Sequence, residues 1–133
     1  MTVQTRGSIG ESLEVLLRCP QQDLGSAWWW DAVGHHLGEL GEELALTDIP
    51  GLAAQISTDA PHYATAARRL SAMHDQAQLD VAHLRRDVAD LGGSTAARDV
   101  RDAIEALLRR VRTLHRLSSD LMLDTYERDI GGD

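Results

Sequence analysis

The chain has 133 residues, a formal net charge of −8 and a single cysteine, Cys19. The length suits one domain with one core, and the apolar content of 43% argues against a disordered chain. The negative charge argues against nucleic acid and anionic membranes as partners, because both would repel it. One cysteine excludes an intramolecular disulfide and a cysteine-based zinc site.

Lysine, asparagine and phenylalanine are absent from the sequence, and every basic residue apart from histidine is arginine. Codons for those three residues are rich in A and T, so their absence suggests a high-GC genome such as that of an actinobacterium. There is no signal-type apolar run and no stretch near the ~20 apolar residues that cross a bilayer, so we expect a cytoplasmic protein. We expect one domain over 1–133, with flexible ends at 1–7 and 131–133.

The first half of the chain predicts two helices. Ser8 to Arg18 has a capping-box start, one apolar side and a Cys19-Pro20 stop. Leu24 to Leu46 predicts a longer helix, whose apolar face is formed by Trp29, Val33, Leu37, Leu40 and Leu44. Three glycines in this helix lower its propensity by roughly 1 kcal/mol each, and close approach of another helix is the usual reason for such residues. They are Gly34, Gly38 and Gly41.

The second half predicts two long helices after a short helix or turn at 51–57. Asp59 as an N-cap with Pro61 in the first turn indicates a helix that runs to Leu91, where Gly92-Gly93 stops it. Ser94 caps a last helix that runs to Arg128. No period-two pattern is present, so we expect an all-α antiparallel bundle. The pattern leaves open whether 8–18 or 51–60 is its fourth member.

Two histidines stand at heptad positions where a helical core usually holds leucine. His74 occupies the same heptad position as Ala67, Val81 and Val88, each seven residues from the next. His115 occupies the same heptad position as Leu108 and Met122. Imidazole is costly to bury without a partner. One explanation is a bound metal, and the other is a hydrogen bond to a backbone carbonyl or a buried acid.

Two residues of the second helix extend this pattern. His36 lies about 60° from the centre of its apolar stripe, and Glu43 follows two turns later on the same edge. His36, Glu43, His74 and His115 would then converge from three helices. Imidazole nitrogens and a carboxylate suit iron, zinc or manganese. His35, Glu39 and Glu42 share the opposite face at a spacing that allows chelation, but a solvated charged face is the favoured interpretation.

Trp28, Trp29 and Trp30 form an unusual run. Three consecutive helical residues spread over about 200°, so they cannot all point into one core. One tryptophan could lie beneath the first helix as a clamp. Another could stay exposed at a protein interface, where tryptophan is enriched. We take Trp28 and Trp30 as candidate residues for a homodimer or partner surface.

Three short motifs resemble the hemerythrin-like, or HHE cation-binding, superfamily. They are Asp59-Ala60-Pro61-His62 with Arg69-Leu70-Ser71-Ala72-Met73-His74-Asp75, Leu114-His115 with Asp120, and the ending Asp120-Leu121-Met122-Leu123-Asp124-Thr125-Tyr126 followed by Asp129-Ile130-Gly131-Gly132. The resemblance implies an antiparallel four-helix bundle, here with an additional short N-terminal helix. It also implies a mononuclear or dinuclear non-haem iron site that binds a diatomic ligand such as oxygen, with Asp48, His62 and Asp120 as further candidate ligands.

The sequence departs from that family at several positions. Ser119 stands four residues after His115, where many members have an acid, and Met73 stands where a glutamate is expected. Asp120 lies about 140° from His115 on a straight helix, so it could ligate the same metal only across a local bulge. The segment 43–48 contains no histidine. A complete di-iron ligand set is therefore missing.

Two functions follow as expectations. The first is a metal-binding bundle that binds or senses oxygen, redox state or metal. The alternative is a metal-free interaction module that acts through the tryptophan surface. Neither a glycine-rich phosphate loop nor a nucleophile elbow is present in the sequence, so turnover of an organic substrate is less favoured than binding.

Overall fold

The computed structural model describes residues 11–20, 22–91 and 97–128. In these ranges every regular element is helical, as predicted: α2 (Ala27–Leu46), α3 (Ile49–Asp59), the 3₁₀ turn η1 (Pro61–Tyr63), α4 (Ala64–Leu91), α5 (Ala97–Met122) and the π-helical η2 (Leu123–Arg128). Residues 11–17 are also helical. The expected caps at Ser8 and Ser94, the Gly92-Gly93 stop and the flexible ends lie outside the described residues.

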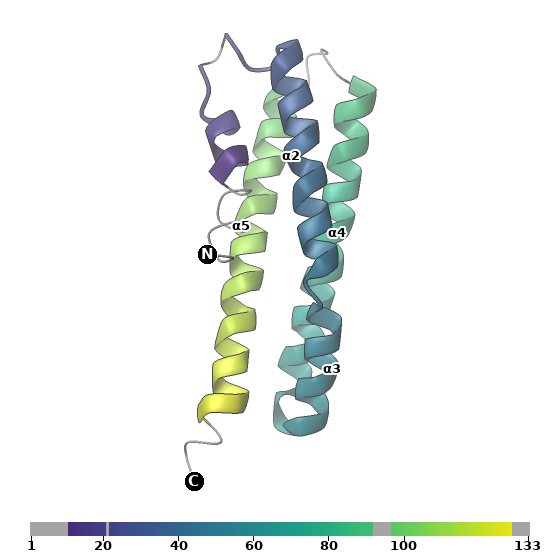
Figure 1. The fold of residues 1–133 in the computed structure, drawn as a ribbon, viewed down its shortest axis with the longest axis vertical. Coiled ribbons are helices and arrows are strands. Elements are labelled where there is room, and N and C mark those ends of the chain that lie inside the picture. The colour runs from purple at the N-terminus through teal and green to yellow at the C-terminus, as the bar shows by residue number, and fades with distance from the viewer. Residues whose placement is uncertain (1–10, 21, 92–96, 129–133) are drawn as a thin grey trace.

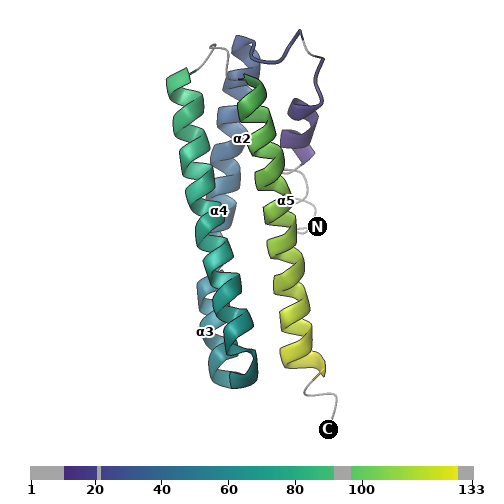
Figure 2. The same cartoon turned by 180° about the vertical axis from the view of Figure 1, so that it is seen from behind.

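The helix α4 organises the bundle, because it packs against α2, α3 and α5. Figure 1 shows α2 and α3 one after the other, with α4 running back beside them, and Figure 2 shows α5 returning beside α4. The segment 51–60 thus contributes a helix to the bundle. The helical residues 11–17 (purple) lie beside the upper part of α5, as Figures 1 and 2 both show. No helix in the described ranges has the length and apolar character needed to cross a membrane.

Helix boundaries follow local capping and differ from the prediction at several places, including the end of α5 at Met122, where the predicted helix continues to Arg128. Ser26 caps α2, with its Oγ accepting from the backbone N–H of Trp29 at 3.4 Å, so the helix begins three residues later than predicted. Asp48 caps α3 by accepting from the N–H of Gly51 at 3.0 Å, and Pro50 fits the first turn. This cap extends the expected short turn into a helix of 11 residues.

The predicted N-cap role of Asp59 is wrong. Asp59 is the last residue of α3, because the N–H of Ala60 still bonds to the carbonyl of Ile56 at 2.8 Å. The 3₁₀ turn η1 then intervenes before α4 begins at Ala64. The carboxylate of Asp59 instead accepts from the hydroxyl of Tyr126 at 3.0 Å, which ties η2 to the end of α3.

Of the three glycines of α2, Gly41 allows the close approach of α4 that the sequence predicts, because a Cβ there would lie 3.2 Å from a methyl carbon of Val81. A Cβ on Gly34 or Gly38 would lie 3.6 or 3.5 Å from the nearest atom of Val88 or Arg85, which is an ordinary van der Waals distance. These α4 positions step by three and four residues in the opposite direction along the chain, as antiparallel packing requires. The close approach brings the buried stripes of α2 and α4 together.

The link between Tyr126 and Asp59 predicts a pH effect. Partial burial raises the pKa of Tyr126, and the hydrogen bond to Asp59 and its negative charge raise it further. The fold therefore favours the neutral phenol, whose contribution is present below the ordinary pKa of about 10 and is lost as the pH rises through the raised value. We expect the free energy of unfolding to fall more steeply above pH about 10 in the native chain than in Tyr126→Phe. Urea unfolding across this range measures the difference, and identical profiles would contradict it.

Candidate metal site

His74 is buried, as predicted, with 3% of its surface exposed. Its Nε2 lies 2.7 Å from the carbonyl oxygen of Leu44 in the last turn of α2. Carbonyls in the last turn of a helix have no partner in their own helix, so the Nε2–H of His74 donates to one of them. This bond engages Nε2 and leaves Nδ1 as the ring nitrogen through which His74 could bind a metal.

The other ring nitrogen of His74 has no hydrogen-bond partner. Nδ1 is buried, and the nearest carboxylate oxygen, on Asp75, is 3.8 Å away, which is too long for a hydrogen bond. Because a carbonyl oxygen can only accept, the ring carries a hydrogen on Nε2. This geometry matches the second explanation given by the sequence, in which a core histidine bonds to a backbone carbonyl.

The other three predicted ligands, His36, Glu43 and His115, are partly buried. The predicted buried stripe through His115 holds only in part, because Met122, at the same heptad position, is 45% exposed. The Nδ1 of His36 lies 2.7 Å from Oε1 of Glu39, a residue one turn further along α2. Within the described ranges, no three of His36, Glu43, His74 and His115 place their ligand atoms within 4.8 Å of one another. This geometry does not fit an iron centre held by that set.

The further candidate ligands also lie apart in the structure. Asp48 caps α3, and His62 is exposed in η1 with its ring centroid 4.3 Å from that of Tyr63. Asp120 is exposed and lines a surface cavity between α4 and α5. None of the three belongs to a cluster of three potential ligands in the part of the chain that the structure describes.

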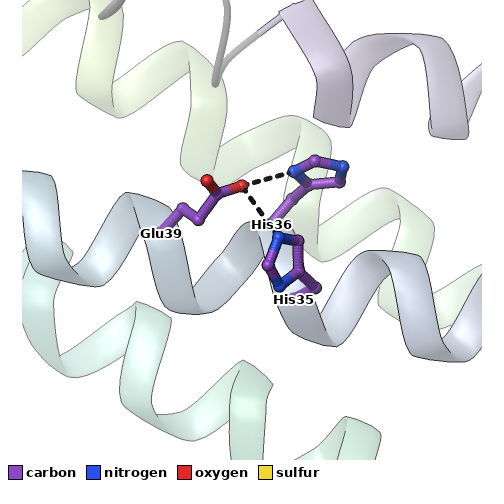
Figure 3. Close-up of side chains that lie close together, drawn as sticks. All are labelled: His35, His36 and Glu39. Carbon is purple, nitrogen blue, oxygen red and sulfur yellow. Dashed lines mark hydrogen bonds and ion pairs between the residues drawn. The ribbon is translucent and has the colours of Figure 1, made fainter.

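Three side chains on α2 do come together: His35, His36 and Glu39 (Figure 3). Oε1 of Glu39 lies 2.7 Å from Nδ1 of His36 and 3.5 Å from Nε2 of His35. Each of the three offers one ligand atom, and these atoms lie within 4.8 Å of one another. His35 is exposed, and the other two are partly buried.

The sequence indicates only part of this cluster. The spacing of His35 and Glu39 places them on one face, whereas the helical wheel places His36 at the edge of the buried stripe. Its side chain instead reaches Glu39 through the i, i+3 spacing that also brings helix residues together. A helical wheel gives the direction of a Cα–Cβ bond but not the rotamer, and the rotamer decides here.

Two imidazole nitrogens and a carboxylate oxygen can hold a divalent transition metal. Metal–ligand distances of about 2.0–2.2 Å in tetrahedral geometry require ligand atoms about 3.4 Å apart, and the two imidazole nitrogens lie 2.7 and 3.5 Å from Oε1 of Glu39. Three protein ligands leave at least one position for water or another ligand.

The three tryptophans occupy different environments. Trp29 is fully buried, and its Nε1–H donates to the carbonyl of Leu16 at 2.9 Å, so Trp29 is the clamp beneath the helical residues 11–17. Trp30 is also buried, at 5% exposure, and meets Trp29 edge-on with ring centroids 5.0 Å apart. Only Trp28 presents a large surface, at 49% exposure. Of the two candidate interface residues, Trp30 therefore belongs to the core.

Comparison of this chain with protein-family models, with curated proteins and with solved structures found no match. A function for the chain therefore has to be inferred from its own residues. Among the described residues, His35, His36 and Glu39 form the group best suited to chemistry, because they combine nitrogen and oxygen ligands at short range.

Proposed function

We propose that this chain binds a divalent transition-metal cation through His35, His36 and Glu39, in a role of metal binding or sensing. The observation that carries the proposal is that two imidazole nitrogens turn toward the same carboxylate oxygen of Glu39. The resemblance to hemerythrin-like bundles also supports a metal role. In the described ranges, only these three residues place their ligand atoms within 4.8 Å of one another, which weighs against the interior set and in favour of this outer face of α2.

The donor set narrows the choice of metal. Two imidazoles and one carboxylate suit Cu²⁺, Ni²⁺, Zn²⁺ and Fe²⁺, and Cu²⁺ is expected to bind most tightly among them. The same composition, two histidines and one carboxylate, holds Fe²⁺ in non-haem oxygenases and leaves positions open for oxygen. We propose more specifically that the metal is non-haem iron and that the chain binds oxygen or senses redox state through it.

Calorimetric titration of the metal-free protein with Zn²⁺ tests the proposal. We expect one saturable site per chain, and we expect His36→Ala and Glu39→Gln each to weaken it about 10-fold or more. Binding should also weaken between pH about 7.5 and about 5.5, because protons compete with the metal for the imidazole nitrogens. His83→Ala is the matched control, since His83 is exposed on α4 outside the cluster.

The outcomes are distinct because surface changes of this kind usually alter stability by no more than about 0.5 kcal/mol, which leaves the variants folded. Loss of binding in the two cluster variants but not in His83→Ala supports the site on α2. Equal affinity in all four proteins would place the metal elsewhere and contradict it.

A metal-free interaction module is the second candidate, favoured by the 49% exposure of Trp28. Trp28 lies two turns before His35 on α2 and so shares its outer face. Concentration-dependent self-association that is lost in Trp28→Ala and does not change with metal would favour this function. Trp28→Ala is the appropriate variant because Trp30 is part of the core.

A further inference from the structure

A surface cavity of about 240 Å³ lies between α4 and α5. Its apolar walls include Met73 from α4 and Leu117 and Leu121 from α5. Leu121 is buried and Met73 partly buried, whereas Leu117 keeps 38% of its surface exposed. The cavity is thus an apolar groove that opens to the surface.

Charged residues border this groove with an excess of negative charge. Asp120 and Asp124 come from α5 and η2, and Arg69 comes from α4. On α5, Leu117, Asp120 and Leu121 are spaced at i, i+3 and i+4, so apolar and acidic side chains share one side of the helix. This arrangement offers apolar contact in the groove and carboxylates beside it.

We propose that this groove docks a basic amphipathic helix of a partner protein, an interaction that goes beyond the proposed metal binding. Apolar residues of such a helix, one turn apart, would contact Met73, Leu117 and Leu121, and its lysine or arginine side chains would lie near Asp120 and Asp124. The flexible thioether of Met73 can adapt to different apolar side chains. A second copy of this chain fits less well, because each copy carries a formal charge of −8.

A labelled Leu/Lys peptide of about 14 residues, with leucine at i, i+3, i+4 and i+7, is the probe. Fluorescence anisotropy of this peptide with the full chain should show saturable binding that Leu117→Lys weakens about 10-fold or more. Leu79→Lys is the matched control, because it adds the same charge at a leucine of α4 that is 53% exposed and lies outside the groove. Asp120→Arg against Asp87→Arg repeats the comparison with acidic positions that are both exposed.

Far-UV circular dichroism establishes whether each variant is folded. If Leu117→Lys does not fold, the comparison of Asp120→Arg with Asp87→Arg tests the docking site instead. Weaker binding in the groove variants alone supports the docking site. Equal weakening in groove and control variants would mean that the peptide follows net charge, which overturns the proposal. Absence of saturable binding, or self-association of the chain that Leu117→Lys abolishes, would overturn it as well. Zn²⁺ binding at α2 is unaffected by these outcomes, so the two proposals can fail separately.

Discussion

Replacing Trp29 with alanine is expected to lower the free energy of unfolding by about 3–5 kcal/mol. The indole is fully buried and is the largest fully buried side chain described. Its removal would leave a cavity and would also remove the donor to the Leu16 carbonyl, the bond that holds the helical residues 11–17 against the bundle. Urea unfolding monitored by far-UV circular dichroism measures the change.

Two variants separate the parts of this effect. Trp29→Phe keeps most of the ring but loses the N–H donor, so we expect a loss of about 1–3 kcal/mol. Trp28→Ala should destabilise the chain much less than Trp29→Ala, because Trp28 is 49% exposed whereas Trp29 is fully buried. If Trp28→Ala proved as destabilising as Trp29→Ala, the assignment of Trp29 as the clamp would be contradicted.

Helical periodicity predicted most of the fold. The apolar face predicted for 24–46 is buried at all five of its positions, Trp29, Val33, Leu37, Leu40 and Leu44. Among the three glycines of α2, Gly41 correctly indicated close approach of another helix. These features are local and repeat along the chain, so a single sequence carries them clearly.

The misplaced boundary at Asp59 shows what periodicity cannot decide. An aspartate followed by Ala60 and Pro61 has the form of a helix start. The same residue can equally end the preceding helix. Here Asp48 caps a helix that continues as far as Asp59. The partner of Asp59, Tyr126, is 67 residues away in sequence, so no local pattern could reveal the contact.

The candidate site was harder to predict than the fold. Heptad spacing correctly placed His74 in the core, because burial depends on the direction of Cβ. The partner of a buried imidazole depends on how neighbouring helices are offset along their axes. Here the offset places His74 of α4 beside the last turn of α2, where the Leu44 carbonyl accepts its hydrogen bond. The sequence spacing of His35, His36 and Glu39 brings these residues near one another on α2. Whether their ligand atoms meet depends on the side-chain rotamers.

The bond from His74 to Leu44 predicts that His74→Leu lowers the free energy of unfolding of the metal-free protein by about 1–3 kcal/mol. Leucine would suit the surrounding core, but it cannot donate, and the Leu44 carbonyl would lose the partner it now has at 2.7 Å. His83→Leu is the matched control on the same helix: His83 is exposed, so its replacement should change stability by no more than about 0.5 kcal/mol.

An interior metal site would give a different result for the same variant. If His74 bound a metal through Nδ1 while Nε2 kept its bond to Leu44, His74→Leu would destabilise the metal-free protein and would also abolish metal binding. If His74 instead caps the last turn of α2, His74→Leu should be destabilised yet should still bind Zn²⁺ at His35, His36 and Glu39. Urea unfolding and Zn²⁺ titration of this one variant therefore distinguish a core histidine that completes the hydrogen bonding of a helix end from one that holds a metal.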